Sequence, residues 1–341
     1  SASRRLVLAA RTHITRIADR GGPTAALAEA RRAARDEAQR GSSALRPAPE
    51  IYGRLFDEKL QRVQGLLASS LRGTQLEAHT SPPLHFRMRC SFSVLDDGGG
   101  GFEFCVYDRA SGRWILAEDC SIACERLCRL LADLRVALAS ERRLRAGLFM
   151  VELLATTAGK ALACLMYTRD LEADFIDVAG DLATRLGAIV VGRSKMKRVA
   201  TGDGRLVQEY EVGGRLYPQI QQELTFSQSN AHTCAAMMCW LDGQTRTKAH
   251  SDLLLELHCG NGNFTLPLAR HFRCVLATEA APQALGFAGE SARRVGLRNV
   301  HFARMSAAET LQALRRERRF RRLRGAGVAV RRMAEALGGG G

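Results

Sequence analysis

The residues best suited to chemistry form a short glycine-containing loop. Residues 253–257 are apolar or acidic and lead directly into the sequence CGNGN at 259–263, and a helix is expected to follow over 264–271. A strand that enters a helix through glycines brings backbone N–H groups close to a ligand at the helix N-terminus. Glu279 ends the next expected strand, 19 residues after Gly260. A carboxylate at that position accepts hydrogen bonds from ribose hydroxyls.

The spacing of the glycines narrows the class of ligand. Gly260 and Gly262 form a G-x-G loop with no third glycine at the spacing found in dinucleotide-binding loops. The loop therefore gives little support to a binding site for pyrophosphate. An adenosyl ligand without a diphosphate, such as S-adenosylmethionine (AdoMet), suits the loop better. A plainer interpretation stays open, in which both glycines only close a turn between a strand and a helix.

A parallel sheet is needed to hold these residues, and the chain predicts one after about residue 225. Strands and helices are expected to alternate from there onward, after a first helix at 232–241. Pro282 suits the first position of a helix, where no backbone donor is needed. Such alternation predicts an α/β doubly wound sheet of Rossmann type. The expected elements are 253–257, 264–271, 275–278, 282–295, 300–303 and 307–315.

The preceding part of the chain is richer in strands. Alternating apolar residues and turn signals predict strands from 87 to 94, around a glycine turn at 98–101, and onward to about residue 193. Helices are expected at 51–71 and 173–186. We therefore expect three parts, which are a basic extension at 1–48, an α+β domain at 49–215 and a Rossmann-like domain at 216–341.

The net charge of +15 is concentrated at the two ends of the chain. Residues 1–47 hold ten arginines against four acids, and residues 315–341 hold nine arginines against two acids. Arginine-rich ends bind phosphate non-specifically, and they are equally compatible with solvated helices or a targeting segment. No apolar stretch approaches the ~18 residues of a membrane span, so we expect a soluble protein without a membrane partner.

Ten cysteines are present, and no secretory signal precedes them. We expect reduced and mostly buried thiols. Cys120, Cys124 and Cys128 recur at every fourth residue, which predicts one face of an amphipathic helix. Metal sites usually use closer cysteine pairs, so we expect no metal here.

Several of these segments resemble one family. The sequences ELHCGNGNFTLPLAR and VLATE resemble the AdoMet-binding region of the RNA uracil-C5 methyltransferases, most closely the tRNA (uracil-5-)-methyltransferases. The likeness extends upstream through FSQSN at 226–230, GRSK at 192–195, Leu148-Phe149 and HFRMRCSF at 85–92. It runs from about Tyr52 to about Arg324. The first 48 residues have no counterpart in it.

The resemblance implies roles for individual residues. It places AdoMet contacts at Gln228, at the position of His258, at Asn263 and at Glu279, beside the loop glycines Gly260 and Gly262. A tyrosine is expected where this chain has His258. The resemblance further implies a tRNA-binding surface at Arg87, Arg89 and Phe149, through phosphate contacts and base stacking. For these three residues a solvated strand face and a core aromatic remain as alternatives.

The catalytic segment of the family is not found in the sequence. Methylation of uracil C5 needs a cysteine thiolate to add to C6 and a base to remove the C5 proton. In the family, D-P-P-R and S-C-N-P segments and a glutamate base follow the cofactor region, but no cysteine lies beyond Cys274 here. Cys259 belongs to the loop motif, so we assign no catalytic residue. We expect the Rossmann-like domain to be incomplete at its C-terminus.

Three interpretations follow from these observations. The first is a tRNA uracil-C5 methyltransferase whose residues 1–341 are an inactive fragment. The second is a paralogue that binds RNA and AdoMet without catalysis, and the third is a methyltransferase of another substrate class. The upstream motifs argue against the third. We expect a monomer in the cytoplasm, or in a mitochondrion or plastid if residues 1–48 are a transit peptide.

Overall fold

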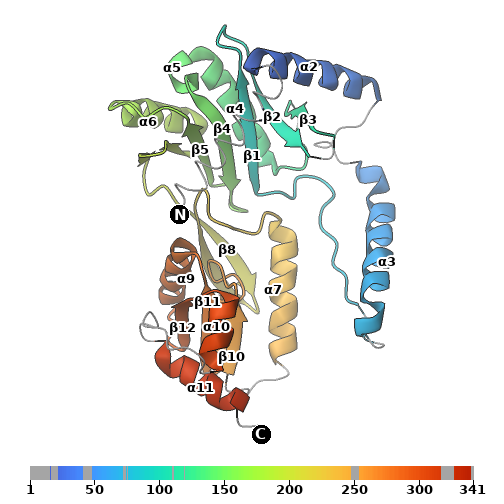
Figure 1. The fold of residues 1–341 in the computed structure, drawn as a ribbon, viewed down its shortest axis with the longest axis vertical. Coiled ribbons are helices and arrows are strands. Elements are labelled where there is room, and N and C mark those ends of the chain that lie inside the picture. The colour runs from blue at the N-terminus through green and yellow to red at the C-terminus, as the bar shows by residue number, and fades with distance from the viewer. Residues whose placement is uncertain are drawn as a thin grey trace.

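The computed structural model describes residues 16, 22–40, 48–71, 74, 76–109, 111–118, 120–246, 253–315 and 326–338. The predicted strands and helices between residues 51 and 315 are largely confirmed, with bounds that shift by a few residues. Two sheets dominate, one from the N-terminal half and one from the C-terminal half, and a two-stranded hairpin lies between them (Figure 1).

The first sheet has seven strands in the order β3-β2-β1-β4-β5-β6-β7. Its pairs are antiparallel except β5 with β6, which are parallel and joined by helix α6. The central strands β4 and β5 are almost wholly apolar and buried, as expected for strands covered on both faces. The strands are β1 (Arg89–Asp96), β2 (Phe102–Asp108), β3 (Arg113–Leu116), β4 (Leu148–Ala155), β5 (Ala161–Tyr167), β6 (Ile189–Arg193) and β7 (Arg198–Ala200).

Helices cover this sheet unevenly. Helices α4 (Glu125–Ser140) and α6 (Phe175–Leu186) pack their leucines into the main core. The short helix α5 (Arg142–Arg145) follows α4. Helix α2 (Pro23–Arg40) lies against β1–β3, where Leu27 covers the fully buried Trp114. Residues 26–34 are thus packed as part of the fold, which lends no support to a transit peptide that includes them.

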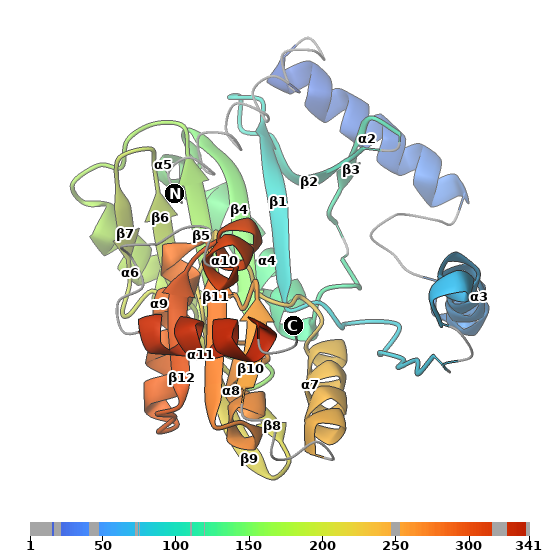
Figure 2. The same cartoon turned by 60° about the horizontal axis from the view of Figure 1, so that its bottom comes forward.

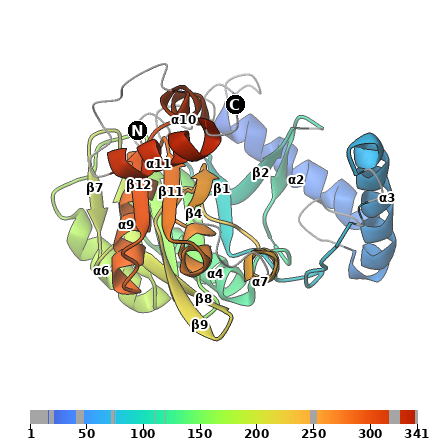
Figure 3. The ribbon, with the colours of Figure 1, turned by 90° about the horizontal axis from the view of Figure 1, so that it is seen from below.

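Helix α3 (Tyr52–Leu71) contrasts with α2. It follows the short turn η1 (Pro49–Ile51), and none of its residues is buried. Figures 2 and 3 show it standing apart from the rest of the molecule. Within the described residues no helix is both long enough and apolar enough to cross a membrane.

The predicted cysteine helix is corrected by the structure. Helix α4 begins only at Glu125, so Cys124 is its N-cap and Cys120 lies in the preceding turn. The reason is that the backbone of residues 122–124 pairs with Arg87 instead of starting the helix. All ten cysteines are free thiols. No group of three or more His, Cys, Asp or Glu residues in the described part of the chain could hold a metal ion.

The hairpin of β8 (Leu206–Val212) and β9 (Arg215–Gln221) spans the expected domain boundary at residue 215. Its Leu206 packs on the β4–β6 face of the first sheet, while β9 contacts helix α9 of the second region. The hairpin therefore connects the two halves physically, and the chain continues from β9 through residues 222–230 into helix α7 (Ala231–Arg246).

The second sheet is parallel, with three strands in the order β10-β11-β12, as predicted for the Rossmann-like region. Val275 and Ala277 of β11 alternate with Cys274 and Leu276, and the latter pack under the last two helices. The remaining elements are β10 (Leu253–Leu257), α8 (Thr265–Leu268), η2 (Ala269–His271), β11 (Cys274–Glu279), α9 (Pro282–Arg294), β12 (Val300–Arg304), α10 (Ala307–Leu314) and α11 (Gly327–Gly338).

Candidate functional site

The glycine loop turns sharply between β10 and α8. Three of its residues have left-handed backbone conformations, with φ of +57° at His258, +58° at Gly260 and +87° at Gly262. A Cβ atom on Gly262 would approach the Cβ of Ala288 to 3.3 Å, so this glycine also lets the loop pack on α9. His258 takes the conformation that a third glycine would supply more readily. This conformation was not predicted from the sequence, although His258 lies two residues before Gly260, at the spacing of the two glycines.

Glu279 lies where it was predicted, at the end of β11 and beside the loop. One carboxylate oxygen accepts the backbone N–H of Gly260 at 3.1 Å, and the other accepts the N–H of Ala281 at 2.8 Å. Because β10 and β11 are parallel neighbours, their carboxyl ends meet at one edge of the sheet. The structure thereby brings together the loop and the carboxylate that the sequence spacing predicted.

Asn263 is buried and held from β9. Its side-chain oxygen accepts a hydrogen bond from the Gln219 amide at 2.6 Å and one from the Cys234 thiol at 3.2 Å. Its side-chain nitrogen Nδ2 is buried and has no hydrogen-bond partner in the described residues. Buried polar groups are rarely left unsatisfied, so Nδ2 is a donor available to a ligand.

Glu256, near the end of β10, is a site residue that the sequence analysis missed. Burial raises the pKa of this carboxyl to about 7, although a hydrogen bond from Thr265 acts in the opposite direction. The Thr265 hydroxyl donates to Glu256 at 2.5 Å, and no ion pair of Glu256 is found in the described part of the chain. An acid inside the apolar strand LLLEL was the available signal.

Cys259 does not offer a reactive thiolate. Its side chain is 3% exposed, and burial raises its pKa above the ordinary thiol value, with Glu256 and Glu279 adding to the effect. A thiolate, not a thiol, is the nucleophile in covalent catalysis. The expectation that Cys259 is only part of the loop therefore agrees with its environment.

The segment 226–230 begins with an exposed residue and is held to the N-terminal sheet by two hydrogen bonds. Ser227 is held by Arg89 through a 3.1 Å hydrogen bond, and the carbonyl of Ser229 accepts the N–H of Met88 at 2.7 Å. Phe226, just before the first of these residues, is 67% exposed, and Gln228, between them, is half-buried. The Gln228 side chain makes no hydrogen bond within the described residues, so the structure leaves its amide available. His258 is also exposed.

The three residues expected at the RNA surface differ sharply. Arg87 is exposed, and its Nε donates only to the carbonyl of Arg89. The Arg89 side chain is 14% exposed and paired with Glu152 at 2.7 Å. Phe149 is 3% exposed and belongs to the core cluster of β4–β6. Of the alternatives in the sequence analysis, the core aromatic is the one found for Phe149, whereas Arg89 is neither solvated nor open to phosphate.

A parallel sheet with a glycine loop after its first strand and a carboxylate after its second defines a Rossmann-like methyltransferase of the AdoMet-dependent class. In agreement, the crystal structure of the Pyrococcus abyssi tRNA (uracil-54, C5)-methyltransferase in complex with S-adenosyl-L-homocysteine shares this fold. Its TM-score is 0.55 at 13% identity, over 72% of this chain and 62% of that chain.

The family model described as tRNA (uracil-5-)-methyltransferase matches residues 51–334, and the chain belongs to this family. The tRNA/tmRNA (uracil-C(5))-methyltransferase of Stutzerimonas stutzeri is 37% identical over 277 residues, which cover 81% of this chain and 76% of that protein. The protein of the same name from Azotobacter vinelandii is 38% identical over 278 residues, with the same coverage. Helix α2 lies outside the matched range.

Proposed function

We propose that the protein binds AdoMet at the loop of residues 258–263 and serves the family reaction, which is methyl transfer to C5 of a uridine in tRNA. One observation carries the proposal. The Glu279 carboxylate lies at the end of β11 and is hydrogen bonded to the Gly260 N–H, so that both of its oxygens lie at the mouth of the loop. Relatives of the chain are named for this activity.

The residues present fit the cofactor. In this proposal Glu279 binds the ribose hydroxyls, and the unpartnered Nδ2 of Asn263 donates to the cofactor. In the same proposal the exposed His258 offers an imidazole, and the half-buried Gln228 of the segment 226–230 offers an amide. Gly260 has no side chain that would keep a ligand away from the backbone. Its φ of +58° is also a conformation that glycine adopts without strain. The bound cofactor supplies an electrophilic methyl group on a sulfonium centre.

For the RNA partner, we keep Arg87 as a contact to tRNA phosphate and assign Arg89 and Phe149 to internal packing. Arg87 is exposed and adjoins the segment 226–230 through the bridge to Asn230. An exposed arginine next to the cofactor region suits a phosphate contact, which positions RNA without reading its sequence. We propose that the protein acts in the cytoplasm as a monomer without a metal.

We further propose that residues 1–341 bind cofactor and tRNA but do not methylate on their own. The last cysteine is Cys274, and the D-P-P-R and S-C-N-P segments are not in the sequence. The thiol in the loop, Cys259, is held protonated by burial.

Calorimetric binding of S-adenosylhomocysteine tests the cofactor site. We expect the unmodified protein to bind and Glu279→Gln to bind about 100-fold more weakly, because charged hydrogen bonds to two hydroxyls are lost. Glu290→Gln on α9 is the matched control. Among the described residues Glu290 pairs with Arg205 and Arg294, away from the loop, so this variant should leave affinity unchanged. Absence of binding by the unmodified protein would refute the proposal, and 5-methyluridine formed on tRNA would refute the lack of catalysis.

A further inference from the structure

The chain has a strained residue just before the segment 226–230. Leu224 follows β9 and adopts a φ of +58°, a left-handed conformation that a branched, bulky side chain rarely takes. Such conformations cost about 1–3 kcal/mol each and persist only where surrounding contacts impose them. Two buried networks, one on each side of Leu224, supply those contacts.

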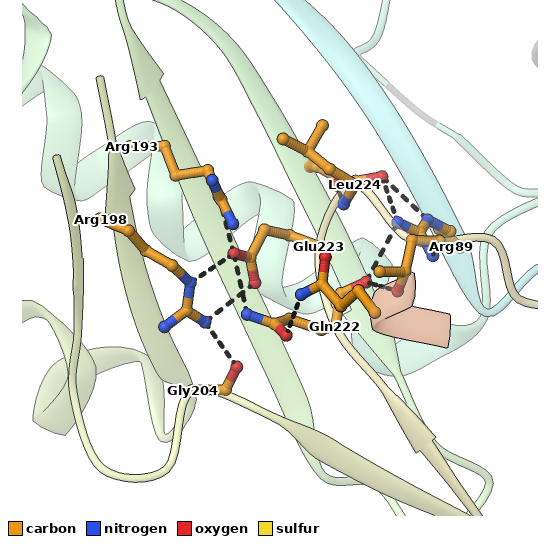
Figure 4. Close-up of polar contacts among 10 residues, drawn as sticks. Arg89, Arg193, Arg198, Gly204, Gln222, Glu223 and Leu224 are labelled. Atoms are coloured by element: carbon orange, nitrogen blue, oxygen red, sulfur yellow. Dashed lines mark hydrogen bonds and ion pairs between the residues drawn. The ribbon is translucent and has the colours of Figure 1, made fainter. Parts of the chain in front are cut away.

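The first network is centred on Glu223. Its carboxylate is completely buried and accepts hydrogen bonds from Arg193 at 2.8 Å and from Arg198 at 2.7 Å (Figure 4). Arg193 ends β6 and Arg198 begins β7, and the two residues are partners in the strand register. The edge of the N-terminal sheet therefore holds residue 223 through two guanidinium groups.

The second network is centred on Glu152 of β4. One of its oxygens accepts the backbone N–H of Leu224 at 2.9 Å, and the other accepts Arg89 at 2.8 Å. Arg89 also donates to the carbonyl of Thr225 and to the hydroxyl of Ser227. The central strands thus bind the chain on the other side of the strained residue.

The turn that contains Leu224 also contacts helix α9, which begins just after Glu279 of the cofactor site. The side-chain amides of Gln222 and Gln283 share a 2.7 Å hydrogen bond. Gln283 lies in the first turn of α9, four residues after Glu279. The turn at 222–225 is therefore attached to the N-terminal sheet, to the start of α9 and, through Ser227, to the segment that carries Gln228.

We propose that Glu223, held by Arg193 and Arg198, is a positioning residue for cofactor binding, which fixes the turn at 222–225 and thereby aims Gln228 at the ligand. This inference rests on the proposed function. It makes the N-terminal sheet, which does not itself contain the glycine loop, a determinant of cofactor affinity. In this proposal the ion pairs of Glu223 hold the segment 226–230 in one orientation, and the strained backbone at Leu224 is a consequence of that orientation.

The test compares affinity for S-adenosylhomocysteine with thermal stability in matched variants. We expect Glu223→Gln and Leu224→Gly to weaken binding about tenfold or more. Leu224→Gly is the decisive variant, because glycine relieves the strain and offsets the lost packing, so its melting temperature stays near that of the unmodified protein. Hydrogen exchange of residues 222–230 should increase in both variants.

Asp242→Asn is the control for a purely structural loss. Asp242 is buried in another ion-pair cluster, with Arg270 and His271, at the far end of α7. This variant should lower the melting temperature and keep the affinity within about twofold. Arg198→Lys, which keeps the charge, should retain more affinity than Arg198→Met.

The outcomes distinguish the positioning role of Glu223 from the proposed cofactor site. If the unmodified protein binds and Leu224→Gly binds equally well, the positioning role is refuted while the cofactor site stands. If the unmodified protein does not bind, both proposals fail. If Glu223→Gln does not fold, Leu224→Gly and the Arg198 pair still give the answer, since neither leaves Glu223 without Arg193.

Discussion

The surroundings of the N-terminal sheet and the cofactor loop differ in how their carboxylates are paired. Glu152 of that sheet pairs with Arg89, and Glu223, which follows β9, pairs with two arginines of the same sheet. In the cofactor loop, Glu256 has the hydroxyl of Thr265 but no ion pair among the described residues, and Nδ2 of Asn263 has no partner. A carboxylate that is paired with arginine is neutralised within the fold, whereas a carboxylate without a cation near an unpartnered amide is typical of a place for a ligand.

A charged residue near a functional site does not by itself belong to that site. Arg89 belongs to a basic motif, RMR, yet its guanidinium is used to hold residues 222–227. Glu256 belongs to an apolar strand, yet it is held by a hydroxyl and has no ion pair in the described part of the chain. Charge pairing, not charge itself, separates scaffold from site in this protein, and three predictions can break or sharpen that separation.

The largest expected effect is on stability, in the scaffold. Arg89→Met should lower the free energy of unfolding by about 3–5 kcal/mol, because it leaves the Glu152 carboxylate buried without its cation. Arg87→Met, two residues away and exposed, should change it by less than about 0.5 kcal/mol. Urea unfolding of the two variants measures this difference. Equal and small effects would show that Arg89 is a surface residue, contrary to the structure.

An intermediate effect is expected from pH, in the cofactor loop. Glu256 holds its proton in the folded protein up to a pKa of about 7, while the unfolded chain releases it near the ordinary value of 4.5. Stability from this residue is therefore fully present below about pH 4.5 and declines as pH rises to about 7. The loss is on the order of 3 kcal/mol, from the size of the pKa difference.

Glu256→Gln isolates this contribution. The variant and the unmodified protein should have similar unfolding free energies at pH 4.5, and the variant should be more stable at pH 8, because no buried charge forms. Chemical unfolding at both pH values, without cofactor, makes the measurement. A pH-independent difference between the two proteins would mean that Glu256 is solvated or paired, and the contrast with Glu152 and Glu223 would disappear.

The cofactor loop was predictable from the sequence because its signals are local. Gly260 and Glu279 lie at the ends of neighbouring parallel strands, and parallel strands bring their carboxyl ends to one edge wherever they pair. Spacing along the chain was therefore enough to place both residues. The same reasoning located β10, β11 and β12 to within one residue.

The RNA-facing residues could not be placed in this way. Whether Arg89 is open depends on Glu152 and Ser227, which lie 63 and 138 residues away, and no local pattern reports such partners. The sequence around Phe149 is compatible with a base-stacking group and with a core residue. Only the packing of the strands around it decides between the two. Left-handed conformations at Leu224 and His258 were also hidden, because sequence signals for them come from glycine and asparagine.

The smallest expected effect concerns His258, the residue of the cofactor loop that has the same backbone conformation as Leu224. Like Leu224, His258 has a left-handed backbone, but its side chain is exposed and no buried network surrounds it. His258→Gly should raise the free energy of unfolding by up to about 1 kcal/mol, since strain relief exceeds the added flexibility of the unfolded chain. His258→Ala keeps the strain and removes the imidazole, so it should not be stabilised. If both variants lose affinity for S-adenosylhomocysteine equally, the imidazole itself contacts the ligand. If only the glycine variant loses affinity, the rigid backbone is what the ligand requires, and the loop then resembles the turn at 222–225 in using strain to hold one conformation.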